Sequence, residues 1–229
     1  MERVKTDSKR IVRVRADSAV SEMMRIGHTN KSDTFIPAVE SDDAFTYLDC
    51  PGFLDNRGAE INISNAVNIK SAVSIASAVR VLVLINYNSL LADRGRGIRE
   101  TLKVLIDLFG TIVALKLACA SILLGVSQVP RFHTDGDEIT PDEVRGLFKD
   151  TTGLDEDSIA VLRQLSQGMF IYDPVNGGES WMKRHELIEH ILALPPLREP
   201  RYAFHTVLTA DDYEVLRAVV RNNVLLMCC

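Results

Sequence analysis

Two kinds of apolar spacing alternate along the chain. After Glu60 and through residues 96–117, apolar residues recur three or four positions apart, as on one face of a helix. At 79–87 and 120–126 the apolar residues are consecutive instead. Continuous β-branched and leucine runs are typical of parallel strands that are buried on both faces. We therefore predict helices in the first two stretches and buried parallel strands in the other two.

Shorter elements complete this pattern. Two sequences have the residues of a capping box, Thr140–Glu143 and Thr209–Asp212, and each predicts the start of a helix. Polar residues at 27–43 predict a loop. Further strands are predicted at 11–15, 23–26, 45–48 and 169–172. Further helices are predicted to start at Thr140, to run through 159–165, and to lie at about 181–194 and 210–226. Strands that alternate with helices indicate an α/β fold, doubly wound around a mostly parallel sheet.

The composition is that of an ordinary globular protein, since 46% of the 229 residues are hydrophobic and 25% are charged. A net charge of −5 gives no electrostatic reason to expect binding to nucleic acid. The four cysteines form no C-x-x-C pair, so a zinc site is not expected. Residues 112–126, the longest apolar stretch, fall short of a membrane span, and no secretory signal is recognised. We expect a cytoplasmic protein with no membrane span.

The segment Asp49-Cys50-Pro51-Gly52 directly follows the predicted strand at 45–48. Ligands of doubly wound folds bind at the carboxyl ends of strands, so the Asp49 carboxylate would face a ligand. Magnesium prefers oxygen ligands, and Gly52 has no Cβ, so its backbone N–H can approach a phosphate oxygen closely. The alternative is a strand-ending turn, because Asp, Pro and Gly are common turn residues.

The longer stretch DCPGFLDNRGAEINISNAVNI, from Asp49 to Ile69, resembles the second switch of P-loop GTPases of the septin-like and immunity-associated group. VRVLVLINY, LLADRGRGIRETLKVLIDLFG and ASILLGVSQVP are similar to the next strand, helix and strand of that fold. IGHTNKSDTFIP resembles the first switch. The resemblance covers about residues 23–176. It implies an N-terminally incomplete GTPase-like domain over 1–176 and a helical C-terminal extension over 177–229.

The resemblance also implies a ligand, which is GTP or GDP bound with Mg²⁺. Thr34 and Asp49 would lie at the metal, and Gly52 at the terminal phosphate. Ser127 and Gln128 would lie in the nucleotide site after the strand at 120–126. Hydrolysis would be an attack of water on the terminal phosphate. No residue is assigned to the catalytic step.

The chain departs from the family at two motifs. It contains no G-x-x-x-x-G-K-[ST], and before Lys31-Ser32 an asparagine, Asn30, stands where the second glycine belongs. The guanine-reading [NT]-K-x-D is replaced by Ser-Gln-Val-Pro, and Pro130 cannot accept the hydrogen bonds that aspartate would accept. The family's first strand and P-loop are therefore missing, or Ile11–Arg15 replaces the strand. A truncated gene model and a degenerate GTPase both explain this.

Two functions follow. The first is a GTPase-like domain that binds guanine nucleotide, with GTP hydrolysis expected only if a P-loop is supplied upstream. The alternative is a non-catalytic pseudo-GTPase that acts as an interaction module, through a homodimer or a partner protein at the switch region. The ending Cys228-Cys229 resembles a lipidated terminus, but it directly follows a predicted helix, so lipidation is not expected.

Overall fold

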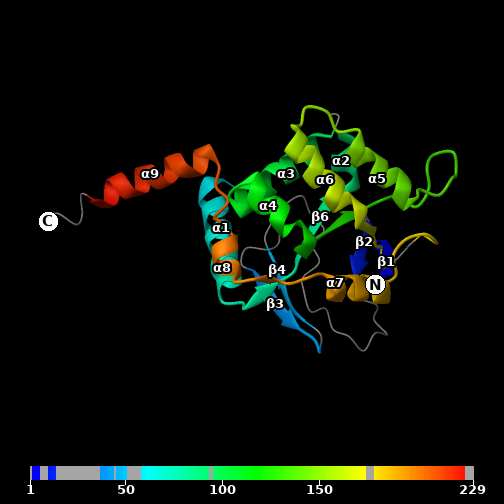
Figure 1. The fold of residues 1–229 in the computed structure, drawn as a ribbon, viewed down its shortest axis with the longest axis horizontal. Coiled ribbons are helices and arrows are strands. Elements are labelled where there is room, and N and C mark those ends of the chain that lie inside the picture. Colours follow the sequence, from blue (N-terminus) through cyan, green and yellow to red (C-terminus); the bar gives the residue numbers. More distant parts are fainter. Residues whose placement is uncertain are drawn as a thin grey trace. The chain divides into compact units, whose positions relative to one another are not determined.

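The computed structural model describes residues 2–5, 10–13, 37–43, 45–50, 58–92, 95–173 and 178–224 (Figure 1). The chain divides into two compact units. The first comprises residues 1–75 and 205–229, and the second comprises residues 76–204. Residues 178–204, which we placed in a C-terminal extension, thus belong to the same unit as the parallel sheet described below.

Within the described residues of the first unit, two pairs of strands are antiparallel. In one, β1 (Glu2–Lys5) pairs with β2 (Arg10–Arg13), which overlaps the predicted strand at 11–15. In the other, β3 (Ala38–Ser41) pairs with β4 (Thr46–Asp49). The loop prediction for 27–43 was therefore wrong at β3. The predicted strand at 23–26 lies outside the described residues.

The β3–β4 turn explains why a polar segment forms a strand. Asp42 accepts a hydrogen bond from the Phe45 N–H at 2.8 Å and another from the Tyr47 hydroxyl, also at 2.8 Å. An aspartate that bonds its own local backbone closes a turn, and the turn then fixes the register of the strands that it joins. Hydrophobic periodicity does not contain this signal.

The described residues of the first unit also include two helices. α1 (Ala59–Ser74) contacts α9 (Ala210–Val224). The capping box predicted at the start of α9 is confirmed. The Thr209 N–H donates to the Asp212 carboxylate at 2.7 Å, and the Asp212 N–H donates to the Thr209 hydroxyl at 3.2 Å.

The second unit contains a three-stranded parallel sheet in the order β6 (Val81–Asn86), β7 (Ile122–Ser127) and β8 (Phe170–Ile171). Helices connect each strand to the next, as in βαβ units. The predicted α/β class with a parallel sheet is confirmed in this form. A short antiparallel pair, β5 (Ala78–Val79) and β9 (Leu197–Arg198), lies outside that sheet.

The predicted helices of the second unit are present, with one break, and two short helices, Tyr87–Leu91 and Pro200–Ala203, were not predicted. The strand predicted at 79–87 therefore ends at Asn86, and Tyr87 begins a helix. Gly110, at φ 80°, ends one helix, and the Thr111 hydroxyl caps the next by accepting from the Ala114 N–H at 3.1 Å. The predicted helix at 96–117 is thus two helices. The full set is α2 (Tyr87–Leu91), α3 (Arg96–Phe109), α4 (Ile112–Ala118), a 3₁₀ turn (Cys119–Ser121), α5 (Pro141–Lys149), α6 (Glu156–Gln167), α7 (Arg184–Ala193) and α8 (Pro200–Ala203).

Within the described part of the chain, no single helix has the length and apolar composition of a membrane span. The segments Arg96–Phe109 and Ile112–Ser121 together pass that test, but they are bent by 91° relative to one another.

Burial differs between the two long strands. The residues of β7 are buried from Ile122 to Val126, as predicted. In β6, however, Leu82 is 42% exposed and Leu84 is 65% exposed. The prediction that β6 is buried on both faces was therefore wrong. Among the described residues β6 pairs only with β7, so β6 is an edge strand with one poorly covered face.

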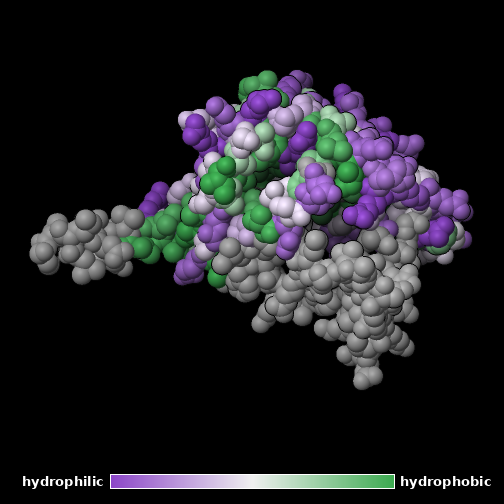
Figure 2. Space-filling model, turned by 90° about the horizontal axis from the view of Figure 1, so that it is seen from below, coloured by the Kyte–Doolittle hydropathy of each residue, from purple (hydrophilic) through white to green (hydrophobic). Residues whose placement is uncertain are grey.

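Figure 2 shows one face of the molecule, where hydrophobic side chains reach the surface in separate patches among hydrophilic ones. Scattered exposure of this kind is normal for globular proteins, because the polar residues are too few to cover the surface.

We predict that Gly125→Ala lowers the free energy of unfolding by about 1–3 kcal/mol, because a Cβ at this position would overpack the sheet. This Cβ would lie 2.5 Å from the Phe170 ring and 2.8 Å from Leu84 Cδ2. Leu84 is exposed and can move, whereas Phe170 is buried. Urea denaturation measures the change.

Gly146→Ala is the matched control. Gly146 lies inside α5, and a Cβ there would meet nothing within 4 Å. Alanine favours the helix over glycine by roughly 0.5–1 kcal/mol, so this variant should be more stable than the parent. If Gly125→Ala were as stable as the parent, the packing of Phe170 against β7 would be contradicted.

Candidate functional site

The carboxyl ends of β6 and β7 lie side by side in the second unit, with Asn86 opposite Ser127 in the register. Tyr87 and Gln128 follow directly. The sequence predicts that Asp49, Ser127 and Tyr87 cluster at one edge of a single sheet. This prediction was wrong for Asp49, because Asp49 ends β4, which pairs with β3 in a separate antiparallel sheet, but Ser127 and Tyr87 do share this edge. In open α/β sheets this edge is where ligands bind. We call Asn86, Tyr87, Ser127 and Gln128 the carboxyl-edge site.

Asn86 and Gln128 join the two strand ends. The Asn86 Nδ2 donates to Gln128 Oε1 at 2.7 Å, while Asn86 Oδ1 caps α2 by accepting from the Asn88 N–H at 2.8 Å. The Ser127 hydroxyl donates to the Ile85 carbonyl at 3.4 Å. Asn86 was not among the predicted site residues. A polar residue that ends an apolar run, just before a helix, was the available signal.

The backbone of Gln128 is unusual. Its φ is 57°, in the left-handed region that residues with a Cβ rarely adopt. Strained backbone of this type persists only where the surroundings fix it, and it is concentrated at ligand sites. The side-chain bond to Asn86 is one of the contacts that hold it.

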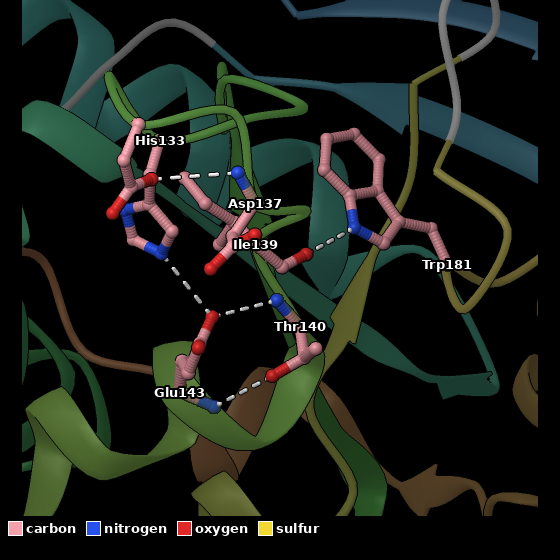
Figure 3. A network of polar contacts seen from close by, with 7 residues as sticks. His133, Asp137, Ile139, Thr140, Glu143 and Trp181 are labelled. Carbon is pink, nitrogen blue, oxygen red and sulfur yellow. Dashed lines mark hydrogen bonds and ion pairs between the residues drawn. The ribbon is translucent and has the colours of Figure 1, made fainter.

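A polar network links His133 to the start of α5 (Figure 3). The Glu143 carboxylate accepts from the Thr140 N–H at 2.9 Å, and His133 Nε2 lies 3.4 Å from it. The predicted capping box is thus confirmed. The Thr140 backbone hydrogen bond lowers the pKa of Glu143, and His133 lowers it further. Burial and the charge of Glu143 both raise the pKa of Tyr87, so its phenol stays protonated at neutral pH.

The chain that leaves β7 forms a tight hairpin over residues 131–139. The Ile139 N–H donates to the Arg131 carbonyl at 2.9 Å, and the His133 N–H donates to the Asp137 carbonyl at 2.8 Å. Phe132 and Glu138 form a β-bridge between these two bonds. We call this segment the 131–139 hairpin.

A cavity of about 550 Å³ lies against α5, β8 and α7. Its lining includes Glu179, Glu186, Glu189, Arg145, Lys183 and His190. Acidic and basic groups are nearly balanced there, so the lining favours neither a cationic nor an anionic ligand.

Asp49 lies in the first unit, where it ends β4 and is half-buried. Its carboxylate has no hydrogen-bond or ion-pair partner within the described ranges. Burial, with a contribution from the Asp49 charge, raises the pKa of Cys50 from 9.0 to about 11. An ionised carboxylate without a partner fits the hard oxygen ligand that Mg²⁺ requires.

The other predicted site residues are distributed as follows. Thr34 and Gly52 lie outside the described residues, and Ser127 and Gln128 belong to the second unit. In the part of the chain that the structure describes, no group of three or more His, Cys, Asp or Glu side chains is placed to hold a metal ion.

The side chains of the carboxyl-edge site can form hydrogen bonds with a ligand. Its amides, hydroxyl and phenol can donate to and accept from a planar polar ligand. Among the described residues, no serine or cysteine is hydrogen-bonded to a histidine, as nucleophilic catalysis would require.

The chain matches no protein-family model, no curated protein and no solved structure. The functional interpretation therefore depends on the residues and their geometry.

We predict that Asp49→Asn lowers the pKa of Cys50 from about 11 but leaves it above 9.0, because burial is the larger cause of the shift. A thiol whose pKa is raised by folding stabilises the folded state below about pH 9, and this contribution is lost as the pH rises to about 11. The variant should lose less stability across that range. The rate of Cys50 alkylation against pH, followed by mass spectrometry, measures the pKa.

Cys119 is the internal control. Its pKa is raised by burial alone, so its alkylation profile should not respond to Asp49→Asn. An unchanged Cys50 profile would show that Asp49 carries no charge beside the thiol.

We also predict that Gln128→Gly is more stable than Gln128→Ala by about 1 kcal/mol, because glycine adopts a left-handed backbone without strain. Both variants lose the side-chain hydrogen bond to Asn86. The difference between their free energies of unfolding therefore reports only the cost of the left-handed backbone at position 128. Urea denaturation of the two variants measures it.

The same pair of substitutions at Glu199, whose φ is 52°, calibrates the size of the backbone effect. If Gln128→Ala and Gln128→Gly were equally stable while the Glu199 pair differed, position 128 would not be left-handed.

Proposed function

We propose that the chain is a GTPase-like domain whose carboxyl-edge site binds the base of a guanine nucleotide. One observation carries the proposal. Asn86 and Gln128 are hydrogen-bonded across neighbouring parallel strands, at the sheet edge where ligands bind, with Gln128 in a left-handed backbone. This places an oriented carboxamide directly after β7, where the resemblance expects contacts to the base.

The Asn86 bond determines what Gln128 can offer. Its Oε1 accepts from Asn86, and its Nε2 has no partner among the described residues. The free amide N–H can donate to the O6 acceptor of guanine, whereas adenine presents a donor at that position. A neutral hydrogen bond contributes roughly 0.5–1.5 kcal/mol net, so the preference for guanine over adenine should be about tenfold or less.

The resemblance assigns the metal and phosphate contacts to the switch residues. Asp49 and Thr34 would hold Mg²⁺, which neutralises phosphate charge when it is bound, and Gly52 would donate its backbone N–H to the terminal phosphate. The 229 residues contain no P-loop. Each charge-assisted hydrogen bond of such a loop contributes about 1.5–3 kcal/mol, so the chain should hold the phosphates weakly.

A second candidate is a non-catalytic pseudo-GTPase that acts as an interaction module. The missing phosphate cradle and the exposed Leu82 and Leu84 on β6 support this alternative. Both candidates share the fold, and they differ in whether any nucleotide binds in a saturable manner.

We predict that GTP and GDP with magnesium bind with a dissociation constant weaker than about 1 µM, and that ATP binds less well. Ligand-observed NMR detects binding in this range, and calorimetric titration quantifies it. A tighter constant would show that another segment supplies the phosphate contacts. The absence of saturable binding by any nucleotide would favour the interaction module.

Two variants test the Asp49 and Gln128 assignments separately. Asp49→Ala should weaken the magnesium-dependent part of binding, and Gln128→Ala should reduce only the preference for guanine. Asp43→Ala, in the exposed β3–β4 turn, is the matched control for loss of a carboxylate. If Asp49→Ala bound magnesium and nucleotide as the parent does, the Asp49–Gly52 segment would be only a strand-ending turn.

A further inference from the structure

Two segments that are distant in sequence are joined beside the carboxyl-edge site. The 131–139 hairpin follows β7, and residues 178–183 follow β8. The Trp181 Nε1–H donates to the Ile139 carbonyl at 2.9 Å, and the Glu179 N–H donates to the Glu138 carboxylate at 2.7 Å. Figure 3 shows the indole N–H of Trp181 directed at Ile139. Trp181 and Ile139 are each only 2% exposed, so water competes poorly for their bond.

Residues 178–183 are themselves held in place. The Met182 N–H donates to the Ile171 carbonyl of β8 at 3.1 Å, and the Lys183 ammonium donates to the Gly178 carbonyl, also at 3.1 Å. The backbone N–H of Trp181 also donates to the Gly178 carbonyl, at 3.3 Å, and this bond closes the turn. The segment is therefore a preformed turn anchored to β8.

This contact requires a glycine at position 178, because two side chains come very close to its backbone. A Cβ at this position would lie 2.3 Å from Glu138 Oε1 and 2.7 Å from Trp181 Nε1. These two side chains form the hydrogen bonds to and from the hairpin. Any side chain at 178 would thus displace both bonds together.

We propose that residues 178–183 are a clamp that positions the 131–139 hairpin, with Gly178 and Trp181 as the positioning residues. The hairpin follows Gln128 after only Val129 and Pro130, and Val129 is buried. Holding the hairpin therefore holds the left-handed backbone of Gln128. All the contacts of the clamp lie within the second unit. The expectation that the clamp affects nucleotide binding rests on the proposed function.

The sequence supplies a built-in probe, since Trp181 is the single tryptophan of the chain. In the parent protein, its emission should be that of a buried indole and resist quenching by iodide. Gly178→Ala should shift the emission to longer wavelength and raise the quenching. Hydrogen exchange of the 131–139 amides should become about tenfold faster, while the β7 amides keep their protection.

The controls separate the clamp from general destabilisation. Gly168→Ala adds the same methyl where nothing lies within 4 Å, and it should leave exchange unchanged. Trp181→Phe keeps an aromatic ring but removes the N–H donor, and Glu138→Ala removes the acceptor without adding bulk. Both should speed exchange in the hairpin alone. Unchanged hairpin exchange in these two variants, or faster exchange throughout the second unit in all three, would overturn the proposal.

Titration with magnesium and GDP tests the link to the nucleotide. GDP should slow hairpin exchange in the parent, and Trp181→Phe should weaken GDP binding about three- to tenfold. If the variants free the hairpin but GDP has no effect on the parent, the clamp is supported and the proposed function fails. If GDP binds equally well to the parent and to variants with a freed hairpin, the clamp does not position the site.

Discussion

The parallel pairing of β7 with its two neighbours is the constraint on which the second unit depends. β7 is buried along its length, and its central residue must be glycine because Phe170 and Leu84 occupy the space of a side chain. This pairing fixes the register that sets Asn86 opposite Ser127. The 131–139 hairpin and the capped start of α5 come after β7 in the chain, and Trp181 comes after β8. The pairing of β7 with β8 therefore sets where these segments meet.

The sequence predicted those features that depend on hydrogen bonds between residues close together in the chain. Both capping boxes were found because their residues bond to one another within a single turn. The strand β3 was missed because its turn depends on the Asp42 side chain, and the exposure of β6 was missed because apolar runs do not show which elements cover them. That Asn86 lies beside Ser127 follows only from the register, which aligns residues 41 positions apart.

The GTPase-like interpretation has uneven support. The mixed α/β class with a three-stranded parallel sheet is compatible with it, and the carboxyl-edge site has amide, hydroxyl and phenol groups that can form hydrogen bonds. Thr34 and Gly52 lie outside the described residues, so these two assignments stay predictions. Asp49 is a suitable metal ligand by its own chemistry, since it is half-buried and has no partner among the described residues.

The edge of β6 has a consequence for the behaviour of the protein in solution. Its six residues contain no charge and no proline, and two of its leucines are exposed. Natural proteins protect strand edges with such residues, because an unprotected edge pairs readily with strands of other molecules. The solubility of the second unit therefore depends on what lies against β6. Conditions that uncover this edge should favour aggregation through it.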